Sequence, residues 1–303
     1  MKYAVIGGAG FVGSHIVKKL NEEKHEVVVI DNLNTGKLSN LKNIENMTFV
    51  KGDIRDFQLL RESCKSVDGI FHQAALASVP DSFEKPEEYH EVNVKGTENI
   101  FKIGKEFQIK IVYASSSSVY GNPIKLPITE DHPRNPLNPY GKTKVDDEKL
   151  AEKYSKEVEI TGLRYFNIFG ENQSMTYAGV ITKFLENIRQ GQAPRIFGDG
   201  TQSRDFIYVG DIVDANLKIM ESNSNELFLN VGTGKTTSIK KMAEMMVKIS
   251  GLDLEPVFLD PLKGDVKSSQ ADITLIQKTI TWKPRMELKN WLEQHMKEVI
   301  RKI

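Results

Sequence analysis

The chain has 303 residues, of which 41 are lysine or arginine and 41 are aspartate or glutamate. This balance gives no electrostatic reason to expect a nucleic acid or a membrane as a partner. No apolar run approaches the roughly 18 residues that cross a bilayer, and the apolar start meets glycine too early for a signal peptide. A single cysteine, Cys64, excludes an internal disulfide. We therefore expect a cytoplasmic protein of about two lobes with a large core.

The first feature along the chain is a glycine-rich turn. A short apolar run over 2–6 precedes the segment Gly7–Gly13, GGAGFVG, and an apolar helical pattern follows it. Strand, glycine turn and helix in this order predict dinucleotide binding. A second predicted strand over 26–30 ends at Asp31, eighteen residues after Gly13. A carboxylate there accepts hydrogen bonds from ribose hydroxyls and repels a 2′-phosphate, which indicates NAD and not NADP.

Apolar runs and helical patterns then alternate. Strand-like runs occur at 47–50, 69–72, 110–114 and 159–164, and long helical patterns at 86–107 and 138–156. This alternation predicts an α/β fold, a doubly wound parallel sheet with helices on both faces. The pattern loosens after Gly170, which indicates a smaller C-terminal lobe for the substrate. We assign residues 1–166 and about 205–232 to the NAD-binding domain, and 167–204 and 233–303 to that lobe.

A tyrosine and a lysine, Tyr140 and Lys144, lie four residues apart in the predicted helix over 138–156. This spacing places both side chains on one helix face. An unperturbed tyrosine, with a pKa of about 10, is a poor base at neutral pH, and a neighbouring ammonium favours the phenolate. Such pairs are also common on solvated helix faces. The glycine-rich opening and the serine run over 115–118 favour proton-transfer chemistry.

Other patterns indicate structure more than function. The segment 232–236, GTGKT, lacks the first glycine of a phosphate loop, because Leu229 occupies that position. Six histidines without metal-ligand spacing predict no metal site. We expect His72 to be structural, and the charge-rich stretch 146–156 to be a solvated helix face.

Eight segments in order resemble the extended short-chain dehydrogenase/reductases, and most closely the UDP-hexose 4-epimerases. The match runs nearly end to end. The segments are 7–13 (GGAGFVG), 31–32 (DN), 53–54 (DI), 72–75 (HQAA), 115–121 (SSSSVYG), 140–144 (YGKTK), 164–167 (RYFN) and 203–205 (SRD).

The resemblance implies an NAD-dependent epimerase, an isomerase acting on UDP-sugars, with Ser116, Tyr140 and Lys144 as catalytic residues. The serine assignment follows from its place four residues before Tyr120, and Ser117 and Ser118 are neighbouring alternatives. The implied cofactor-binding residues are Gly7, Gly10, Phe11, Val12, Gly13, Asp31, Asn32, Asp53, Ile54, Gln73, Ala74, Ala75, Asn93, Tyr140, Lys144 and Phe166. The implied substrate-binding residues are Ala77, Ser78, Ser116, Tyr140, Asn167, Val180, Arg204, Asp265 and Ser269.

Three departures from the family pattern concern the substrate. Leu262 stands where members usually carry an arginine for the diphosphate, and Lys263 is the possible replacement. Ser269 matches a position where a bulky tyrosine restricts members to glucose and galactose. Ala77 stands where glucose-restricted members carry a lysine. The last two indicate room for an N-acetyl group, so we expect UDP-N-acetylhexosamines and UDP-glucose or UDP-galactose as substrates.

Alternative functions stay open within the same fold. A 4,6-dehydratase needs an acidic pair where Ser117 and Ser118 stand, which argues against that reaction. A UDP-glucuronate epimerase or decarboxylase needs a basic group near the sugar carboxylate, and the loops could supply one. A non-catalytic NAD-binding regulator is a third reading. The resemblance also implies a homodimer through the helices over 86–107 and 138–156.

Overall fold

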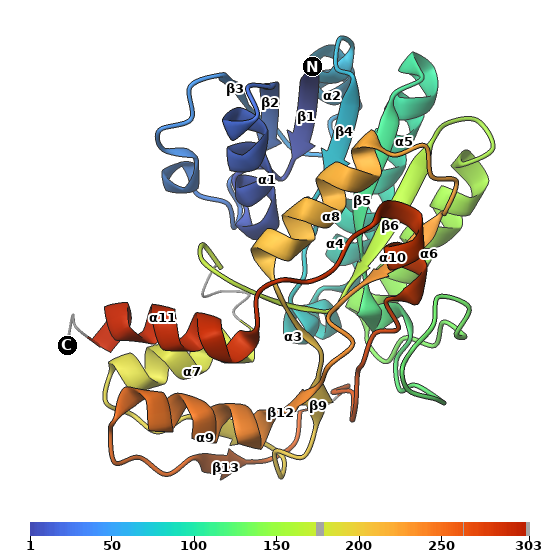
Figure 1. Cartoon of the computed structure of the whole chain (residues 1–303). Coiled ribbons are helices and arrows are strands. Elements are labelled where there is room, and N and C mark those ends of the chain that lie inside the picture. The colour runs from blue at the N-terminus through green and yellow to red at the C-terminus, as the bar shows by residue number, and fades with distance from the viewer. Residues whose placement is uncertain (174–178, 263, 301–303) are drawn as a thin grey trace.

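The larger lobe is built on a seven-stranded parallel sheet (Figure 1). The structure is a computed structural model that describes residues 1–173, 179–262 and 264–300. The strand order is β11-β6-β5-β4-β1-β2-β3, which confirms the predicted doubly wound α/β fold. The strands are β1 (Lys2–Ile6), β2 (Glu26–Asp31), β3 (Met47–Lys51), β4 (Gly69–His72), β5 (Lys110–Ser116), β6 (Ile160–Tyr165) and β11 (Phe228–Val231).

Both faces of this sheet are covered by helices. Successive side chains of a strand point to opposite faces, so Val5 joins one core while Ala4 and Ile6 join the other. The first face carries α1 (Phe11–Glu22), α8 (Val209–Glu221) and α10 (Thr274–Ile280). The second carries α2 (Phe57–Cys64), α5 (Gly96–Phe107) and α6 (Pro139–Tyr154). Cys64 is buried and unpaired in this second core, where burial raises the pKa of its thiol to about 12.

The strand order reverses between β1 and β4. β1 pairs with β2 on one side and with β4 on the other, and each half of the sheet continues outward from there. In an open parallel sheet, ligands bind in the crevice beyond the carboxyl ends of the strands at such a switch point. The residues that end β1, β4 and β5 are therefore placed at one site.

The two long predicted helices are present. Residues 86–107 form α4 (Pro86–Tyr89), a π-helical segment (His90–Lys95) and α5 in unbroken succession. The helix α6 begins at Pro139, and the Asn138 side chain accepts a hydrogen bond from the N–H of Gly141 at 2.8 Å. Proline in the first turn and asparagine at the cap are a strong helix start. Tyr140 therefore lies in the first turn and Lys144 one turn later.

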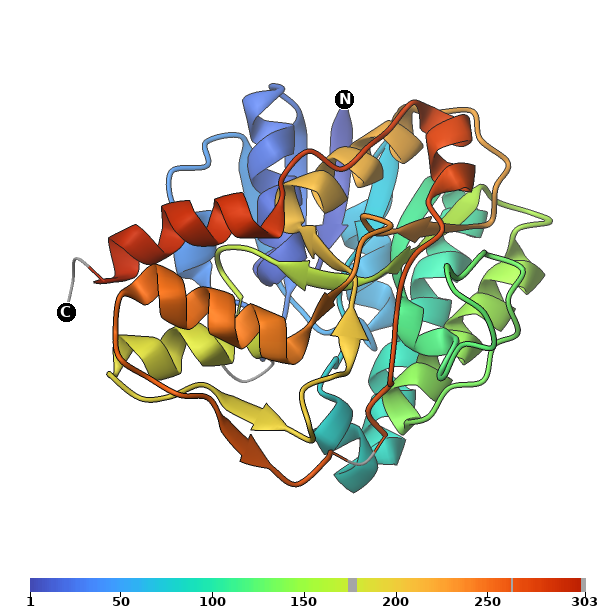
Figure 2. The ribbon, with the colours of Figure 1, turned by 60° about the horizontal axis from the view of Figure 1, so that its bottom comes forward.

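A smaller lobe lies beyond the carboxyl edge of the sheet (Figures 1 and 2). Its core packs Phe184, Met242 and Trp291 together. Its helices are α7 (Val180–Arg189), α9 (Ile239–Ser250) and α11 (Leu288–Ile300). Its short strand pairs are β7 (Asn167–Phe169) with β10 (Phe206–Tyr208), β9 (Ser203–Arg204) with β12 (Thr237–Ser238), and β8 (Arg195–Phe197) with β13 (Val257–Leu259).

One part of the assigned C-terminal lobe returns to the sheet. Ile276 of α10 and Trp282 belong to the core of the larger lobe, and the Trp282 indole N–H donates to the carbonyl of Asp211 at 3.1 Å. The chain therefore crosses between the lobes again after residue 233. The division of the chain into two domains stays a prediction. The segment with Ile276 and Trp282, which we assigned to the C-terminal lobe, packs on the larger lobe.

The prediction of a solvated, charge-rich face over 146–156 is wrong for two of its charged residues. Asp147 and Glu148 are fully buried. The Arg164 guanidinium, on β6, binds both Glu148 carboxylate oxygens at 2.8 Å, and the Ser115 hydroxyl donates to Glu148 at 2.7 Å. Glu148 therefore faces the sheet, where its partner Arg164 lies on β6, sixteen residues later in the sequence.

We expect Glu148→Gln to lower the free energy of unfolding by about 3 kcal/mol or more, because it leaves the Arg164 charge buried without a counter-ion. Urea denaturation measures the loss. Glu152→Gln on the same helix is the control: Glu152 is exposed and pairs with Arg134, so its loss should stay below about 1 kcal/mol. Equal losses in the two variants would contradict the buried-pair account.

Candidate active site

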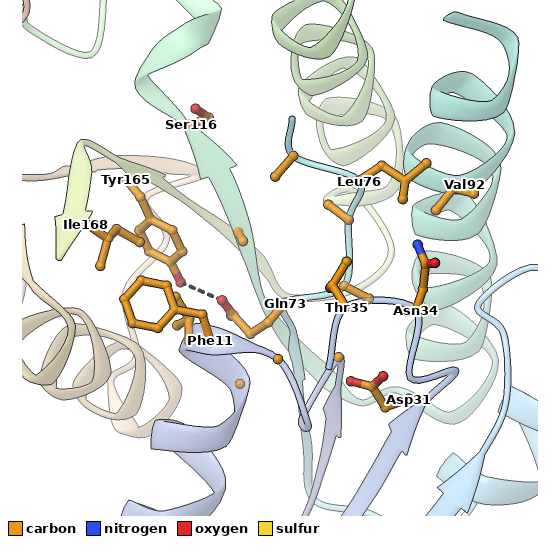
Figure 3. A pocket seen from close by; sticks show the side chains of 18 of the residues that line it. Phe11, Asp31, Asn34, Thr35, Gln73, Leu76, Val92, Ser116, Tyr165 and Ile168 are labelled. Atoms are coloured by element: carbon orange, nitrogen blue, oxygen red, sulfur yellow. Dashed lines mark hydrogen bonds between the residues drawn. The ribbon is translucent and has the colours of Figure 1, made fainter. Parts of the chain in front are cut away.

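A cavity of about 380 Å³ lies at the carboxyl ends of the central strands. Figure 3 shows Asp31 and Ser116 at opposite ends of its labelled side chains. It brings together most of the residues predicted from the sequence. These are Gly7, Gly10, Phe11, Val12, Gly13, Asp31, Asn32, Ile54, Gln73, Ala74, Ala75, Ala77, Ser116, Tyr140, Lys144, Phe166 and Asn167.

The glycine turn leaves backbone exposed to the cavity. Gly7 has a positive φ of 76°, and a side chain there would meet the backbone nitrogen of Ala74 at 2.7 Å. A Cβ on Gly13 would lie 2.1 Å from the Gly7 carbonyl oxygen, so helix α1 can approach the turn only with glycine. No side chain caps the N-terminus of α1 at Gly10. Free N–H groups at a helix start bind phosphate, so the turn fits the pyrophosphate of a dinucleotide.

Asp31 ends β2 and faces the cavity. Its carboxylate accepts one N–H from Ala9 at 3.0 Å and one from Leu33 at 2.7 Å. Burial raises the pKa of Asp31, and these two hydrogen bonds oppose that rise. Each oxygen keeps a further acceptor position, which suits the two hydroxyls of a ribose.

The hydroxyl of Ser116 lines the cavity at the end of β5. Its oxygen accepts the N–H of Ser118 at 3.1 Å and the Ser118 hydroxyl at 2.9 Å. Its own proton is therefore free to be donated to a bound molecule. Ser115 also lines the cavity, but its hydroxyl donates to Glu148, and Ser117 and Ser118 are not among the lining residues. The geometry thus distinguishes Ser116 within the serine run.

The Lys144 ammonium is buried beside the cavity with 3% of the residue exposed. It donates to the Ala114 carbonyl and to the Asp147 carboxylate, each at 3.1 Å. Burial lowers the pKa of Lys144, but Asp147 and then Tyr140 raise it, and the net shift is upward. The ammonium therefore stays charged next to the Tyr140 phenol, as proton transfer by a tyrosine requires.

His72 is structural, as predicted. It is buried at the end of β4, and its Nε2 lies 2.9 Å from the Thr97 hydroxyl. Burial, and then the charge of Lys144, lower the pKa of His72 to about 3. A neutral imidazole that does not line the cavity is not placed to act on a molecule bound there.

Three predicted residues lie just outside the cavity wall. Asp53 binds Arg55 through two hydrogen bonds at 2.8 Å, which hold the pKa of Asp53 well below its usual range, and it accepts from Asn32 at 3.1 Å. The buried Asn93 amide binds both backbone groups of Leu76. Ser78 caps α3 (Val79–Glu84). Asp53 and Asn93 thus support lining residues.

The predicted substrate residues of the smaller lobe form a separate group. Arg204 and Asp265 form an ion pair of 2.5 Å, and the N–H of the buried Ser269 donates to the Ser203 carbonyl at 3.1 Å. Neither these residues nor Val180 line the cavity, although Gly179 does. Asp265 instead lines a second hollow of about 430 Å³, together with Leu262, Phe197 and Lys267. The possible replacement at Lys263 lies outside the described residues.

Some lining residues were not predicted. They are Ile30, Asn34, Thr35, Gly52, Leu76, Val92, Ala114, Ser115, Tyr165, Ile168, Gln173 and Gly179. Tyr165 belongs to the core of the larger lobe, and its hydroxyl also binds Gln73 at 3.2 Å at the cavity wall (Figure 3). Asn34 and Thr35 could have been found, because they follow Asp31 in the loop that leaves β2.

Two negative observations concern the described residues. None of their helices is long and apolar enough to cross a membrane. None of their His, Cys, Asp and Glu side chains form a group of three or more that could hold a metal ion.

Comparison with known proteins gives consistent matches along the chain. A model of the NAD dependent epimerase/dehydratase family matches residues 3–232. A putative UDP-glucose 4-epimerase of Methanocaldococcus jannaschii is 40% identical over 96% of this chain and 98% of its own length.

Two solved structures have the same fold over the full length of this chain. A UDP-N-acetylglucosamine 4-epimerase from Methanobrevibacter ruminantium, in complex with UDP-N-acetylmuramic acid, has a TM-score of 0.94 at 38% identity and is covered over 99% of its length. A mutant UDP-glucuronic acid 4-epimerase from Bacillus cereus, in complex with UDP-4-deoxy-4-fluoro-glucuronic acid and NAD, has a TM-score of 0.93 at 29% identity and is covered over 100%. This chain therefore belongs to the NAD dependent epimerase/dehydratase family.

Proposed function

We propose that this protein is an NAD-dependent UDP-hexose 4-epimerase that acts through a 4-keto sugar. One observation carries the proposal: Ser116, Tyr140 and Lys144 line the same cavity as the glycine turn and Asp31. The epimerases among its relatives support it. A homodimer through the helices over 86–107 and 138–156 is part of the proposal.

The chain's own residues would handle the proton. Tyr140 removes the proton of the sugar 4-hydroxyl, and the Lys144 ammonium stabilises its phenolate. Ser116 donates a hydrogen bond to the same sugar oxygen. NAD, when bound, would supply the hydride chemistry at C4 in both directions, with the turn of the keto sugar between them. Asp31, Asn32 and the glycine turn hold the dinucleotide throughout, so NAD should stay bound between turnovers.

The cavity wall favours a neutral sugar. Lys144 is the single cationic side chain among the lining residues that the structure describes, and it is already tied to Asp147. The carboxylate of a uronic acid would find no unpaired basic side chain among the described residues of this wall. Ala77 adds little bulk, which supports room for an N-acetyl group. We therefore propose UDP-N-acetylglucosamine and UDP-N-acetylgalactosamine as substrates, with UDP-glucose and UDP-galactose accepted too.

The second candidate is a UDP-glucuronate epimerase or decarboxylase, and the Bacillus cereus relative favours the epimerase of these two. A non-catalytic NAD-binding regulator is disfavoured, because the three catalytic candidates are all retained in one cavity.

Asp265 and Lys267 line the second hollow, and we assign the nucleotide end of the substrate to the smaller lobe. Leu262, exposed at this hollow, carries no charge for the diphosphate.

Incubation of the purified protein with UDP-glucose, UDP-N-acetylglucosamine or UDP-glucuronate, each alone, tests the proposal. We expect the first two to give their 4-epimers without added NAD, because the cofactor is retained and regenerated. Chromatography of the nucleotide sugars measures the products. Release of carbon dioxide from UDP-glucuronate would favour the decarboxylase, and no product from any sugar would favour the regulator.

We expect Tyr140→Phe to lower kcat roughly 100- to 10,000-fold, because it removes the proton-transfer group. NAD should stay bound, because the glycine turn, Asp31 and Lys144 would still hold it. Steady-state kinetics and the NAD content of the purified variant are the measurements. Tyr154→Phe is a matched control on the same helix, since its hydroxyl binds Glu98 away from the cavity. Full activity in Tyr140→Phe would exclude this tyrosine as the base.

We expect Ser269→Tyr to reduce kcat/KM for UDP-N-acetylglucosamine about 10- to 200-fold more than for UDP-glucose. Ser269 lies outside the cavity in this structure, so the added ring would have to reach the acetyl group from the smaller lobe. Competition between the two sugars measures the ratio. Ser269→Ala, which adds no bulk, is the control. Equal losses on both sugars would show that this residue does not select the substrate.

A further inference from the structure

The carboxylate of Asp147 lies next to Lys144, on the side of the lysine away from the cavity. The Asp147 oxygen Oδ2 is 3.1 Å from the Lys144 ammonium, and Asp147 is fully buried. The two residues are three positions apart on α6, so the helix itself fixes the pair. The Ala114 carbonyl accepts a second N–H of the same ammonium. Asp147 is therefore the direct counter-ion of a group that faces the reaction.

Asp147 has little else to bind. Its second oxygen, Oδ1, has no hydrogen-bond partner among the described residues. The neighbouring Glu148 is the opposite case, because Arg164, Ser115 and Arg134 bind its two oxygens. An ionised Asp147 is thus compensated by Lys144 alone, and its charge acts directly on the ammonium.

The described groups around Asp147 supply no cation other than Lys144. Burial raises the pKa of Asp147 to about 7, Lys144 opposes this rise, and Glu148 and Asp146 add to it. From the sheet, two groups interact electrostatically with this pair. The neutral His72 on β4 is acted on by the charge of Lys144, and Tyr113 on β5, whose pKa burial raises, is acted on by Asp147. The remaining charged groups are engaged elsewhere: Arg164 and Arg134 with Glu148, and Asp146 with Lys142 and Lys149.

We propose that Asp147 is a positioning residue that holds Lys144 and sets the pH range over which Tyr140 and Lys144 work. The inference rests on the proposed function, because it takes these two residues as the proton-transfer pair. A nearby negative charge favours the protonated form of every neighbour. It therefore keeps Lys144 an ammonium to higher pH, and the charge beside Tyr140 persists with it.

Asp147→Asn tests this assignment, because it keeps the shape and an acceptor for Lys144 but removes the charge. We expect the basic limb of the pH profile of kcat/KM to move to lower pH by about one unit, with KM for the UDP-sugar nearly unchanged. The acid limb should move less, because burial raises the pKa of Asp147 to about 7 and its charge is partly lost on that limb. The ultraviolet absorbance of the Tyr140 phenolate, as the difference from Tyr140→Phe, should shift its midpoint in the same direction. This titration needs no turnover, so it tests Asp147 even if no UDP-sugar is a substrate.

Asp146→Asn is the matched control, since it removes the same charge one residue away on the exposed side of α6. Its profile and its phenolate midpoint should match the wild type. Asp147→Ala, which also removes the acceptor, should shift both readouts as Asp147→Asn does. Unshifted profiles in the Asp147 variants would overturn the proposal. Failure of Asp147→Asn to fold, while Asp146→Asn folds, would also overturn it by making Asp147 a structural residue.

Discussion

The buried ion pair between Glu148 and Arg164 is the constraint on which the site depends. It joins α6 to β6, and the Ser115 hydroxyl joins β5 to the same carboxylate. Ser116 follows directly on the strand, and Lys144 lies one turn earlier on the helix. The cost of burying two charges is offset by paired, charge-assisted hydrogen bonds. One carboxylate thereby sets where the hydroxyl and the ammonium stand relative to each other.

The reversal of strand order between β1 and β4 explains why distant segments meet at this constraint. The glycine turn follows β1, the Gln73 segment follows β4, and Ser116 ends β5. All three lie at the carboxyl edge because every strand of the sheet is parallel. The chain then passes into the smaller lobe and back, with Trp282 packed on α8 through Asp211. The edge of the sheet is thus covered by a lobe that is itself anchored on the sheet.

Features set by local spacing could be predicted from the sequence. The turn Gly7–Gly13, the acid at Asp31 and the i, i+4 pair on α6 need only strand and helix geometry to be placed. Features set by distant partners could not. A run of charges on α6 does not show that Glu148 finds Arg164 across the sheet. Likewise, nothing local shows that the Asn93 amide binds the backbone of Leu76 and not a ligand.

The distribution of charge suits a reaction in which a sugar must turn. Among the described lining residues, the cavity holds one cation, Lys144, and that cation is held by Asp147 and Ala114. Two cationic groups lie instead on the smaller lobe: Lys267 lines the second hollow, and Arg204 is held in an ion pair with Asp265, which lines it too. A molecule whose anionic end binds at the second hollow would form no ion pair in the cavity at its other end. That end could therefore turn without breaking one. The hydrogen bonds of Ser116 and Tyr140 can be exchanged between the two faces of a ring, whereas a charged clamp would fix one face.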